Sequence, residues 1–286
     1  MDLLASAAEQ GRICALAATG QRYLMECAAT QPDLFPPKPF APGLFSSLAL
    51  ANSFSSPDAT AEDLRVLLRT ALWVFAADWQ MDYVASTPGQ VDELVRTCVR
   101  VAEGGDPATP LTTFLQGIRD DLAERPAYEE LQRRWRDVLR RFVAAMAREW
   151  HWRAAGDKPA LGEYLANAAS AASSFVNLTH WIALGDPATL RHLDQLMDIG
   201  DEVQRVLRLL NDLAGYERDQ EWGDLNALLL GATRAEVTDL IMNSVDVCRK
   251  RLDPLRGRCP GAVAYLERQI GFSTGFYGHG DYWGEL

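Results

Sequence analysis

Residues 211–219 read N-D-L-A-G-Y-E-R-D, and this stretch is the most informative of the chain. It lies in a helical pattern that we expect over residues 187–218. Asn211, Gly215 and Asp219 are spaced by four residues, so a helix places them along one face. Amide and carboxylate oxygens are the hard ligands that Mg²⁺ prefers. The spacing therefore predicts a metal site at these three positions, with water or another residue completing the ligand set at the glycine.

Two arginines flank this predicted metal site. Arg208 lies about one turn before Asn211, and Arg218 directly precedes Asp219. The planar guanidinium group matches phosphate oxygens, and Mg²⁺ is commonly bound through a few protein oxygens together with substrate phosphates. The combination predicts a diphosphate site, in which Arg208, Asn211 and Asp219 are candidate catalytic residues and Arg218 binds substrate.

A second acidic motif lies upstream, at the end of an apolar run. Asp78 and Asp82 are four residues apart and follow the sequence A-L-W-V-F at residues 71–75. A helix places both carboxylates on one face, with Phe75 about one turn deeper on that face. We expect Asp78 and Asp82 to form a metal-binding rim above an apolar pocket, with Asp78 in a catalytic role.

A competing acidic pair at Asp120 and Asp121 has no such apolar approach. It stands between Arg119 and Arg125. We interpret this pair as a solvated helix turn that does not bind metal.

The two motifs resemble those of the class I terpene synthases. The second metal motif of that family runs Asn-Asp-x-x-Ser/Thr/Gly-x-x-x-Glu and often ends Lys-Glu-x-x-x-Gly-Asp, and the first reads Asp-Asp-x-x-Asp. In this chain Trp79 replaces the second aspartate of the first motif, Arg218 replaces the lysine, and Gly223-Asp224 is retained. The resemblance implies Mg²⁺, of which the family commonly binds three ions, or Mn²⁺ in its place. The implied ligands are Asp78, Asp82, Asn211, Gly215 and Asp219.

Two other features of the family are altered. The diphosphate-sensing arginine of many bacterial members is absent, and Asn167 lies near its place. Arg208, three residues before Asn211, resembles the arginine of the plant-type arrangement and is its expected substitute. The C-terminal Arg-Tyr pair is also missing, which leaves His279 and Tyr282 as candidates to approach the diphosphate.

The resemblance implies an all-α, single-domain helical bundle over residues 1–286, with a central apolar cavity. The patterns agree, because helical periods alternate with Gly, Asp and Pro punctuation and a proline-rich connector at residues 31–42 wraps the body. We expect helices at residues 3–28, 44–52, 60–86, 89–103, 110–123, 127–155, 160–183, 187–218, 233–252 and 259–274.

The implied activity is that of a lyase acting on a prenyl diphosphate. We expect ionisation of geranylgeranyl diphosphate, release of diphosphate, and cyclisation of the allylic cation to a diterpene hydrocarbon or alcohol. Farnesyl diphosphate and a bicyclic diphosphate from a class II cyclase are alternative substrates. A chain-elongating prenyltransferase is disfavoured, because two full Asp-Asp-x-x-Asp motifs are absent from the sequence. A non-catalytic helical protein that binds prenyl diphosphates is the alternative of another class.

Cyclisation needs an apolar cavity whose aromatic rings stabilise a cation. Several aromatic side chains lie in or near its expected walls, and core packing is the ordinary role of such residues. We expect two or three of the following to line the cavity: Phe75, Trp79, Phe175, Trp181, Tyr216, Trp222, Tyr277 and Trp283. The candidate substrate contacts are Phe75, Trp79, Phe175, Trp181 and Tyr282, in addition to Arg208 and Arg218.

Composition limits the other function classes. The net charge of −11 argues against binding to nucleic acid or to an anionic membrane surface. No window reaches about 18 uninterrupted apolar residues, and the start lacks a basic segment followed by an apolar core. We therefore expect a cytoplasmic protein whose partner is its substrate, and a homodimer stays open. The 5 cysteines show no paired zinc-ligand spacing.

Overall fold

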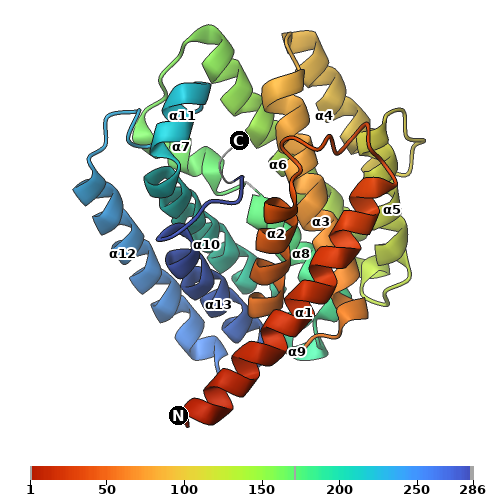
Figure 1. Cartoon of the computed structure of the whole chain (residues 1–286), viewed down its shortest axis with the longest axis vertical. Helices are drawn as coiled ribbons and strands as arrows, with labels where there is room; N and C mark the ends of the chain where they lie inside the picture. Colours follow the sequence, from red (N-terminus) through yellow and green to blue (C-terminus); the bar gives the residue numbers. More distant parts are fainter. Residues whose placement is uncertain (1, 171, 284–286) are drawn as a thin grey trace.

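The computed structural model describes residues 2–170 and 172–283, and every regular element in these ranges is helical (Figure 1). The predicted all-α bundle is confirmed for this part of the chain. The elements are α1 (Leu3–Ala29), α2 (Pro42–Ser55), α3 (Ala61–Trp79), the π-helical turn η1 (Gln80–Val84), α4 (Pro88–Ala102), α5 (Pro110–Ala123), α6 (Tyr128–Ala155), α7 (Leu161–Ala168), α8 (Ala172–Leu184), α9 (Pro187–Arg191), α10 (Leu193–Ala214), α11 (Tyr216–Trp222), α12 (Arg234–Leu252), the 3₁₀ turn η2 (Asp253–Leu255) and α13 (Pro260–Tyr277).

Local sequence signals begin and end these helices. At the start of α3, the Thr60 hydroxyl accepts from the Asp63 N–H and the Asp63 carboxylate accepts from the Thr60 N–H, each at 3.1 Å. This capping box satisfies two backbone donors that have no partner within the helix. Gly156 and Gly223 end α6 and α11 in the left-handed conformation, with φ of 71° and 74°.

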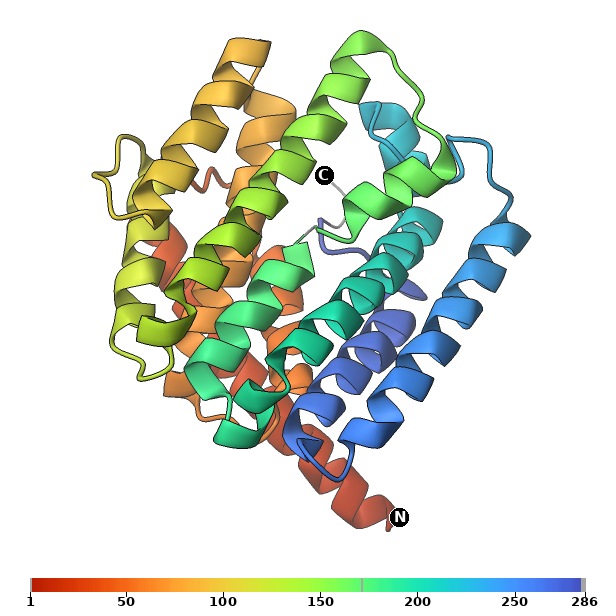
Figure 2. The same ribbon diagram turned by 180° about the vertical axis from the view of Figure 1, so that it is seen from behind.

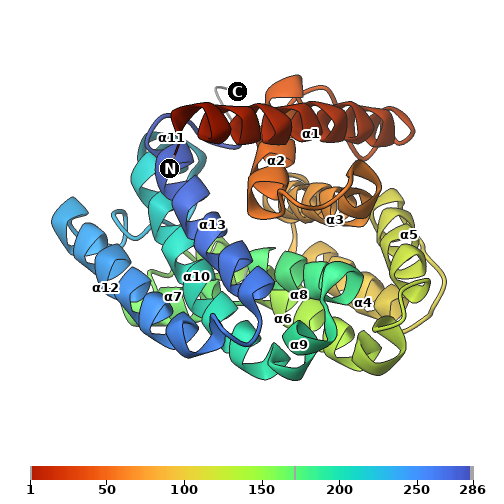
Figure 3. The ribbon, with the colours of Figure 1, turned by 90° about the horizontal axis from the view of Figure 1, so that it is seen from below.

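One cavity lies among seven of the described helices. The helices α2, α3, α6, α8, α10, α11 and α13 all contribute residues to its wall. Figure 3, seen from below, shows α2, α3, α8, α10 and α13 arranged in a ring, while α1, α5 and α12 lie outside it. Seen from behind, the C-terminal end of α6 rises to the same end of the bundle as α11 (Figure 2). That end carries the acidic motifs.

An aromatic core supports the wall formed by α3, α6 and α8. Trp73, Trp135 and Phe175 are fully buried, and the ring of Phe175 lies 5.7 Å from that of Trp73 and 5.3 Å from that of Trp135. Both indole N–H groups are bonded, Trp73 to the carbonyl of Leu111 at 3.0 Å and Trp135 to the hydroxyl of Thr179 at 3.1 Å. Buried indoles with satisfied donors fix the distances between these helices.

The proline-rich connector lies against the helical body. Leu34, Phe35 and Phe40 are buried, and the ring of Phe35 lies 5.1 Å from that of Phe40 and 5.3 Å from that of Phe114 in α5. These apolar contacts hold the connector in place, although it forms no helix. No helix of the described residues is long and apolar enough to cross a lipid bilayer.

Three expected helices are interrupted, and each expectation of a continuous helix was wrong. The expected helix at 60–86 passes into η1 after Trp79, and that at 160–183 ends as α7 at Ala168, followed by turn residues 169 and 170, with α8 covering Ala172–Leu184. The expected helix at 187–218 is divided into α9, α10 and α11. Its last interruption is at Gly215, where α10 ends. Asn211 and Asp219 therefore do not lie on one continuous helix face.

Candidate active site

The cavity has a volume of about 300 Å³, and both acidic motifs lie on its wall. Asp78 and Asp82 come from the end of α3 and from η1. Arg208 and Asn211 come from the last turns of α10, and Arg218 and Asp219 come from α11. The fold thus brings together two motifs that begin at residues 78 and 211, as the sequence predicts, while their roles as ligands stay predictions. Gly215 does not line the cavity.

The polar end of the cavity carries more carboxylates than cations. Among the described residues that line it, six are acidic and three are arginines: Asp78, Asp82, Glu149, Asp219, Asp224 and Asp281 against Arg153, Arg208 and Arg218. Burial and then the charge of Asp224 raise the pKa of Asp78 to about 7, and burial and then Asp78 raise the pKa of Asp82 well above its usual range. A divalent cation would offset this repulsion.

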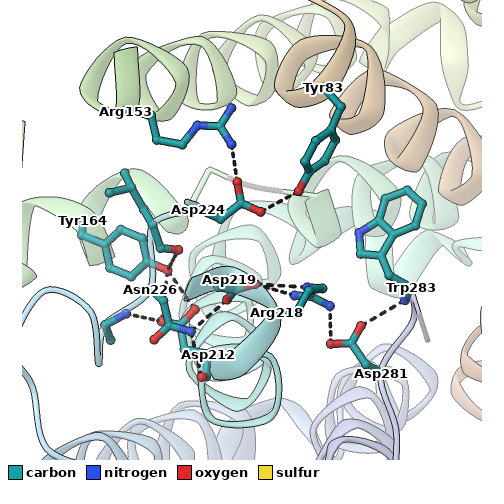
Figure 4. A network of polar contacts seen from close by, with 12 residues as sticks. Tyr83, Arg153, Tyr164, Asp212, Arg218, Asp219, Asp224, Asn226, Asp281 and Trp283 are labelled. Atoms are coloured by element: carbon teal, nitrogen blue, oxygen red, sulfur yellow. Dashed lines mark hydrogen bonds and ion pairs between the residues drawn. The ribbon is translucent and has the colours of Figure 1, made fainter. Parts of the chain in front are cut away.

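Asp78 and Asp82 differ in their partners. Asp78 makes no hydrogen bond within the described residues, so its carboxylate is free to bind an ion. The carboxylate of Asp82 accepts from Arg153 at 2.8 Å, and Arg153 also pairs with Asp224. The hydroxyl of Tyr83 donates to Asp224 at 2.6 Å. These contacts tie the first motif to the segment that follows α11 (Figure 4).

Arg208 is held by an acid that the sequence analysis did not assign. Its guanidinium donates to both carboxylate oxygens of Glu149 in α6 at 2.8 Å. The amide of Asn167 donates to the same carboxylate at 3.0 Å and to the carbonyl of Ala145 at 2.9 Å. Asn167 itself is buried and does not line the cavity. It therefore positions Glu149 and does not replace the missing arginine directly.

Asp219 is held on both carboxylate oxygens. Oδ1 accepts from Arg218 at 2.8 and 3.1 Å, and Oδ2 accepts from the amide of Asn226 at 2.8 Å. Asn226 is fully buried and also donates to the carbonyl of Asp212 at 2.8 Å (Figure 4). The Asp212 carboxylate in turn accepts from the Tyr164 hydroxyl at 2.9 Å. A buried network thus fixes the second motif before any ligand binds.

Gly223 explains how Asp224 reaches this site. Its left-handed conformation ends α11 and reverses the chain, and the N–H of Asp224 donates to the carbonyl of Asp219 at 2.9 Å. The reversal carries the Asp224 carboxylate to Tyr83 and Arg153. Glycine adopts this conformation at little cost. The pair Gly223-Asp224 is therefore a structural unit of the site.

The oxygen atoms on this wall fit Mg²⁺. Carboxylates of Asp78, Asp82, Asp219 and Asp224 and the amide of Asn211 are hard donors at one end of one cavity. Among the described residues, no three acidic, histidine or cysteine side chains are grouped closely enough to enclose an ion alone. Mg²⁺ is usually bound through one or two carboxylates together with water and substrate phosphates, so the donor set is of the right kind.

The aromatic residues divide between the wall and the core. Of the eight named from the sequence, Phe75, Tyr277 and Trp283 line the cavity, and Tyr282 also lines it. Phe175 and Trp181 on α8, which the sequence named as substrate contacts, are buried in the packed core and do not line the cavity. Trp79 does not line the cavity either, and its ring stacks on Tyr83, which does, at 4.8 Å.

The remaining candidates lie away from the cavity. His279 is exposed and does not line it. Asp121 is partly exposed and pairs with Arg69, and Asp120 pairs with Arg119 at 2.9 Å. Asp120 thus pairs with its sequence neighbour and Asp121 with an arginine of α3, and neither lines the cavity.

Several charged or hydrogen-bonding residues of the site were not assigned from the sequence, among them Tyr83, Glu149, Arg153, Asp224 and Asp281. One signal was present, because Glu149 and Arg153 are four residues apart and share a face of α6. A second was the turn glycine before Asp224. Their partners lie far away along the chain, so only the tertiary structure connects them.

Comparison with known proteins gives one family. The family described as terpene synthase family 2, C-terminal metal binding, matches residues 69–252. The chain is 30% identical over 208 residues to ent-pimara-9(11),15-diene synthase of Streptomyces sp. strain KO-3988, covering 68% of this chain and 69% of that protein.

Solved structures with similar folds are more distant in sequence. Linalool/nerolidol synthase from Streptomyces clavuligerus, in complex with 2-fluorogeranyl diphosphate, is 18% identical with a TM-score of 0.71, over 92% of this chain and 93% of that one. An α-eudesmol synthase is 18% identical with a TM-score of 0.69, over 92% and 94% of the two chains. These similarities confirm the expected fold.

Proposed function

The chain belongs to the class I terpene synthase family, and we propose that it is a magnesium-dependent cyclase of a prenyl diphosphate. One observation carries the proposal. Two acidic motifs, one around Asp78 and one from Asn211 to Asp219, line the polar end of a cavity that also has aromatic walls. Charged groups that bind diphosphate and an aromatic wall that holds the hydrocarbon are the two parts that such a reaction needs.

Each polar residue has a proposed task. Asp78, Asp82, Asn211 and Asp219 hold the metal ions, and Arg208 and Arg218 donate to the diphosphate oxygens. When bound, Mg²⁺ would stabilise the departing diphosphate without proton transfer. The guanidinium groups supply fixed positive charge where negative charge develops as the carbon–oxygen bond breaks. Glu149 and Asn226 position Arg208 and Asp219.

We propose that aromatic side chains of the cavity wall face the cation that forms. Phe75, Tyr277, Tyr282 and Trp283 line the cavity next to its polar residues. The face of an aromatic ring attracts a desolvated cation by about 2 kcal/mol or more. The same side chains exclude water, which would capture the cation early.

We propose geranylgeranyl diphosphate as the substrate and a cyclic diterpene as the product. The relative named for a pimaradiene, a diterpene hydrocarbon, supports this choice. Farnesyl diphosphate is the second candidate, because similar folds are found in linalool/nerolidol and α-eudesmol synthases.

The test is incubation of the purified protein with prenyl diphosphates of ten, fifteen, twenty and twenty-five carbons, with and without Mg²⁺. Extracted products are identified by gas chromatography with mass detection, and pyrophosphate release is measured in parallel. We expect a cyclic C20 product that requires Mg²⁺. If only a C15 product is formed, the substrate is farnesyl diphosphate and the proposal of geranylgeranyl diphosphate is wrong. Binding of diphosphate without release from any substrate would instead support a binding protein.

A further inference from the structure

The tail after α13, residues 278–283, returns to the cavity and places a carboxylate on Arg218. Asp281 forms an ion pair with the Arg218 guanidinium, and each side chain is only 17% exposed. The backbone N–H of Trp283 donates to the Asp281 carboxylate at 3.0 Å, which fixes its orientation (Figure 4). A partly buried ion pair of this kind is stronger than one on the open surface.

Gly215 makes room for this arrangement. A Cβ atom at residue 215 would lie 2.6 Å from Nη2 of Arg218 and 3.1 Å from the carbonyl oxygen of Asn211. The guanidinium of Arg218 therefore occupies the space into which a serine or threonine at 215 would project. From there it reaches Asp219 and Asp281 together.

The residues after Asp281 form part of the cavity wall. The ring of Tyr282 lies 5.6 Å from that of Phe75, and the ring of Trp283 lies 5.0 Å from Phe75 and 5.9 Å from Phe40. Within the described part of the tail, the ion pair with Arg218 thus lies next to aromatic contacts with α3 and with the connector. A change in the contact between Asp281 and Arg218 should therefore alter the positions of the Tyr282 and Trp283 side chains.

We propose that Asp281 competes with the substrate diphosphate for Arg218, so that binding of the diphosphate displaces Asp281. The inference rests on the proposed function, because it takes Arg218 as a diphosphate ligand. A diphosphate carries more negative charge than one carboxylate and presents several oxygens to the guanidinium fork. The two anions also repel each other in an end of the cavity that already has an excess of acids. Displacement leaves Tyr282 and Trp283 held in the wall by their aromatic contacts with Phe75, without the ion pair beside them.

The test is calorimetric titration of inorganic pyrophosphate, with Mg²⁺ present, into matched variants. We expect Asp281→Asn to bind pyrophosphate about tenfold more tightly than the unaltered protein, which corresponds to about 1.4 kcal/mol. Asp281→Glu, which keeps the charge, should bind as the unaltered protein does. In an Arg218→Gln background, Asp281→Asn should change the affinity by less than about threefold.

Two results of the titration would overturn the proposal. One is unchanged or weaker binding by Asp281→Asn. The other is an equal gain in the Arg218→Gln background, since that would reflect only the removal of a negative charge from an acidic cavity. Absence of pyrophosphate binding by the unaltered protein would overturn the proposed function as well. If the unaltered protein binds pyrophosphate and Asp281→Asn binds it with the same affinity, only the proposed competition is overturned.

A second measurement follows the aromatic wall and does not depend on turnover. The protein is labelled with 5-fluorotryptophan, and a Trp283→Phe variant assigns the fluorine resonance of Trp283. We expect pyrophosphate with Mg²⁺ to move this resonance, and Asp281→Asn to show the moved position without ligand. A Trp283 resonance that is identical in Asp281→Asn and in the unaltered protein without ligand would contradict the coupling.

Discussion

The two acidic motifs lie on the wall of one cavity but are held in different ways. Asp78, in the first motif, has no hydrogen-bond partner among the described residues, and burial raises its pKa to about 7. Asp219, in the second, is bonded on Oδ1 by Arg218 and on Oδ2 by Asn226. Asp78 is therefore a free carboxylate and Asp219 a fixed one, and Asp82 of the first motif is also held, by Arg153 at 2.8 Å.

This difference indicates that the two carboxylates depend on their neighbours to different degrees. A fixed carboxylate holds its position before an ion arrives, so its neighbours share in its function. A free carboxylate takes its orientation from the ion, so its function belongs to that side chain alone. Substitutions of neighbours should accordingly affect the second motif, and substitutions of the ligand itself should dominate at the first.

The largest effect is expected for Asp78→Asn. It removes a metal ligand that nothing else holds, so turnover should fall by at least about a hundredfold, or about 2.7 kcal/mol in the barrier. Thermal stability without metal should be unchanged or higher, because a repelled buried carboxylate is lost. Pyrophosphate release and thermal unfolding measure the two. If the variant retains more than about a tenth of the turnover rate, Asp78 is not a metal ligand.

A smaller effect is expected for Asn226→Ala, which leaves Asp219 in place but unpaired on Oδ2. Turnover should fall about tenfold, and the Mg²⁺ concentration for half-maximal rate should rise. Stability should fall by about 1–3 kcal/mol, since buried acceptors lose their donor. The exposed Asn243→Ala on α12 is the control for the substitution itself. An unaltered Mg²⁺ dependence would show that Asn226 has only a structural role.

A smaller effect on the kinetics than that of Asn226→Ala is expected for Gly215→Ala. The added Cβ lies 2.6 Å from Nη2 of Arg218 and must displace that group. We expect KM for the prenyl diphosphate to rise about threefold to tenfold, with less change in kcat. Gly11→Ala on α1 is the control, because a Cβ there meets nothing within 4 Å. Steady-state kinetics that are equal for both variants would contradict the proposed position of Arg218.

The smallest effect is expected for Asp121→Asn. It breaks a partly exposed ion pair with Arg69 and touches neither motif. The free energy of unfolding should change by about 1 kcal/mol or less, and turnover should stay within about twofold. A hundredfold loss of turnover in Asp121→Asn would contradict the assignment of the metal site to Asp78.

The sequence predicted that the two motifs share one cavity, but it did not predict the structure around them. Offsets of four residues at Asp78 and Asp82 report the direction of side chains on one helix, and that information is local. The interruption at Gly215 was not predicted, because the apolar periodicity of residues 187–218 continues through it. The site keeps its ligands on the cavity wall in spite of this break, through the short helix α11.

Other parts of the site depend on distant contacts. Glu149 meets Arg208 across 59 residues, and Asp224 meets Tyr83 across 141. The positions of Phe175 and Trp181 depend on which face of α8 is turned to the cavity. That rotation is set by packing against Trp73 and Trp135, which no pattern within α8 specifies.

The most direct test of the central proposal is a crystal structure with Mn²⁺ and pyrophosphate, in which anomalous scattering locates the metal. We expect Mn²⁺ within coordination distance of Asp78 and, separately, of Asn211 and Asp219, with pyrophosphate oxygens between the two motifs and in contact with Arg208. Mn²⁺ bound only elsewhere, or pyrophosphate bound away from these residues, would contradict the assignment of this cavity as a diphosphate and metal site.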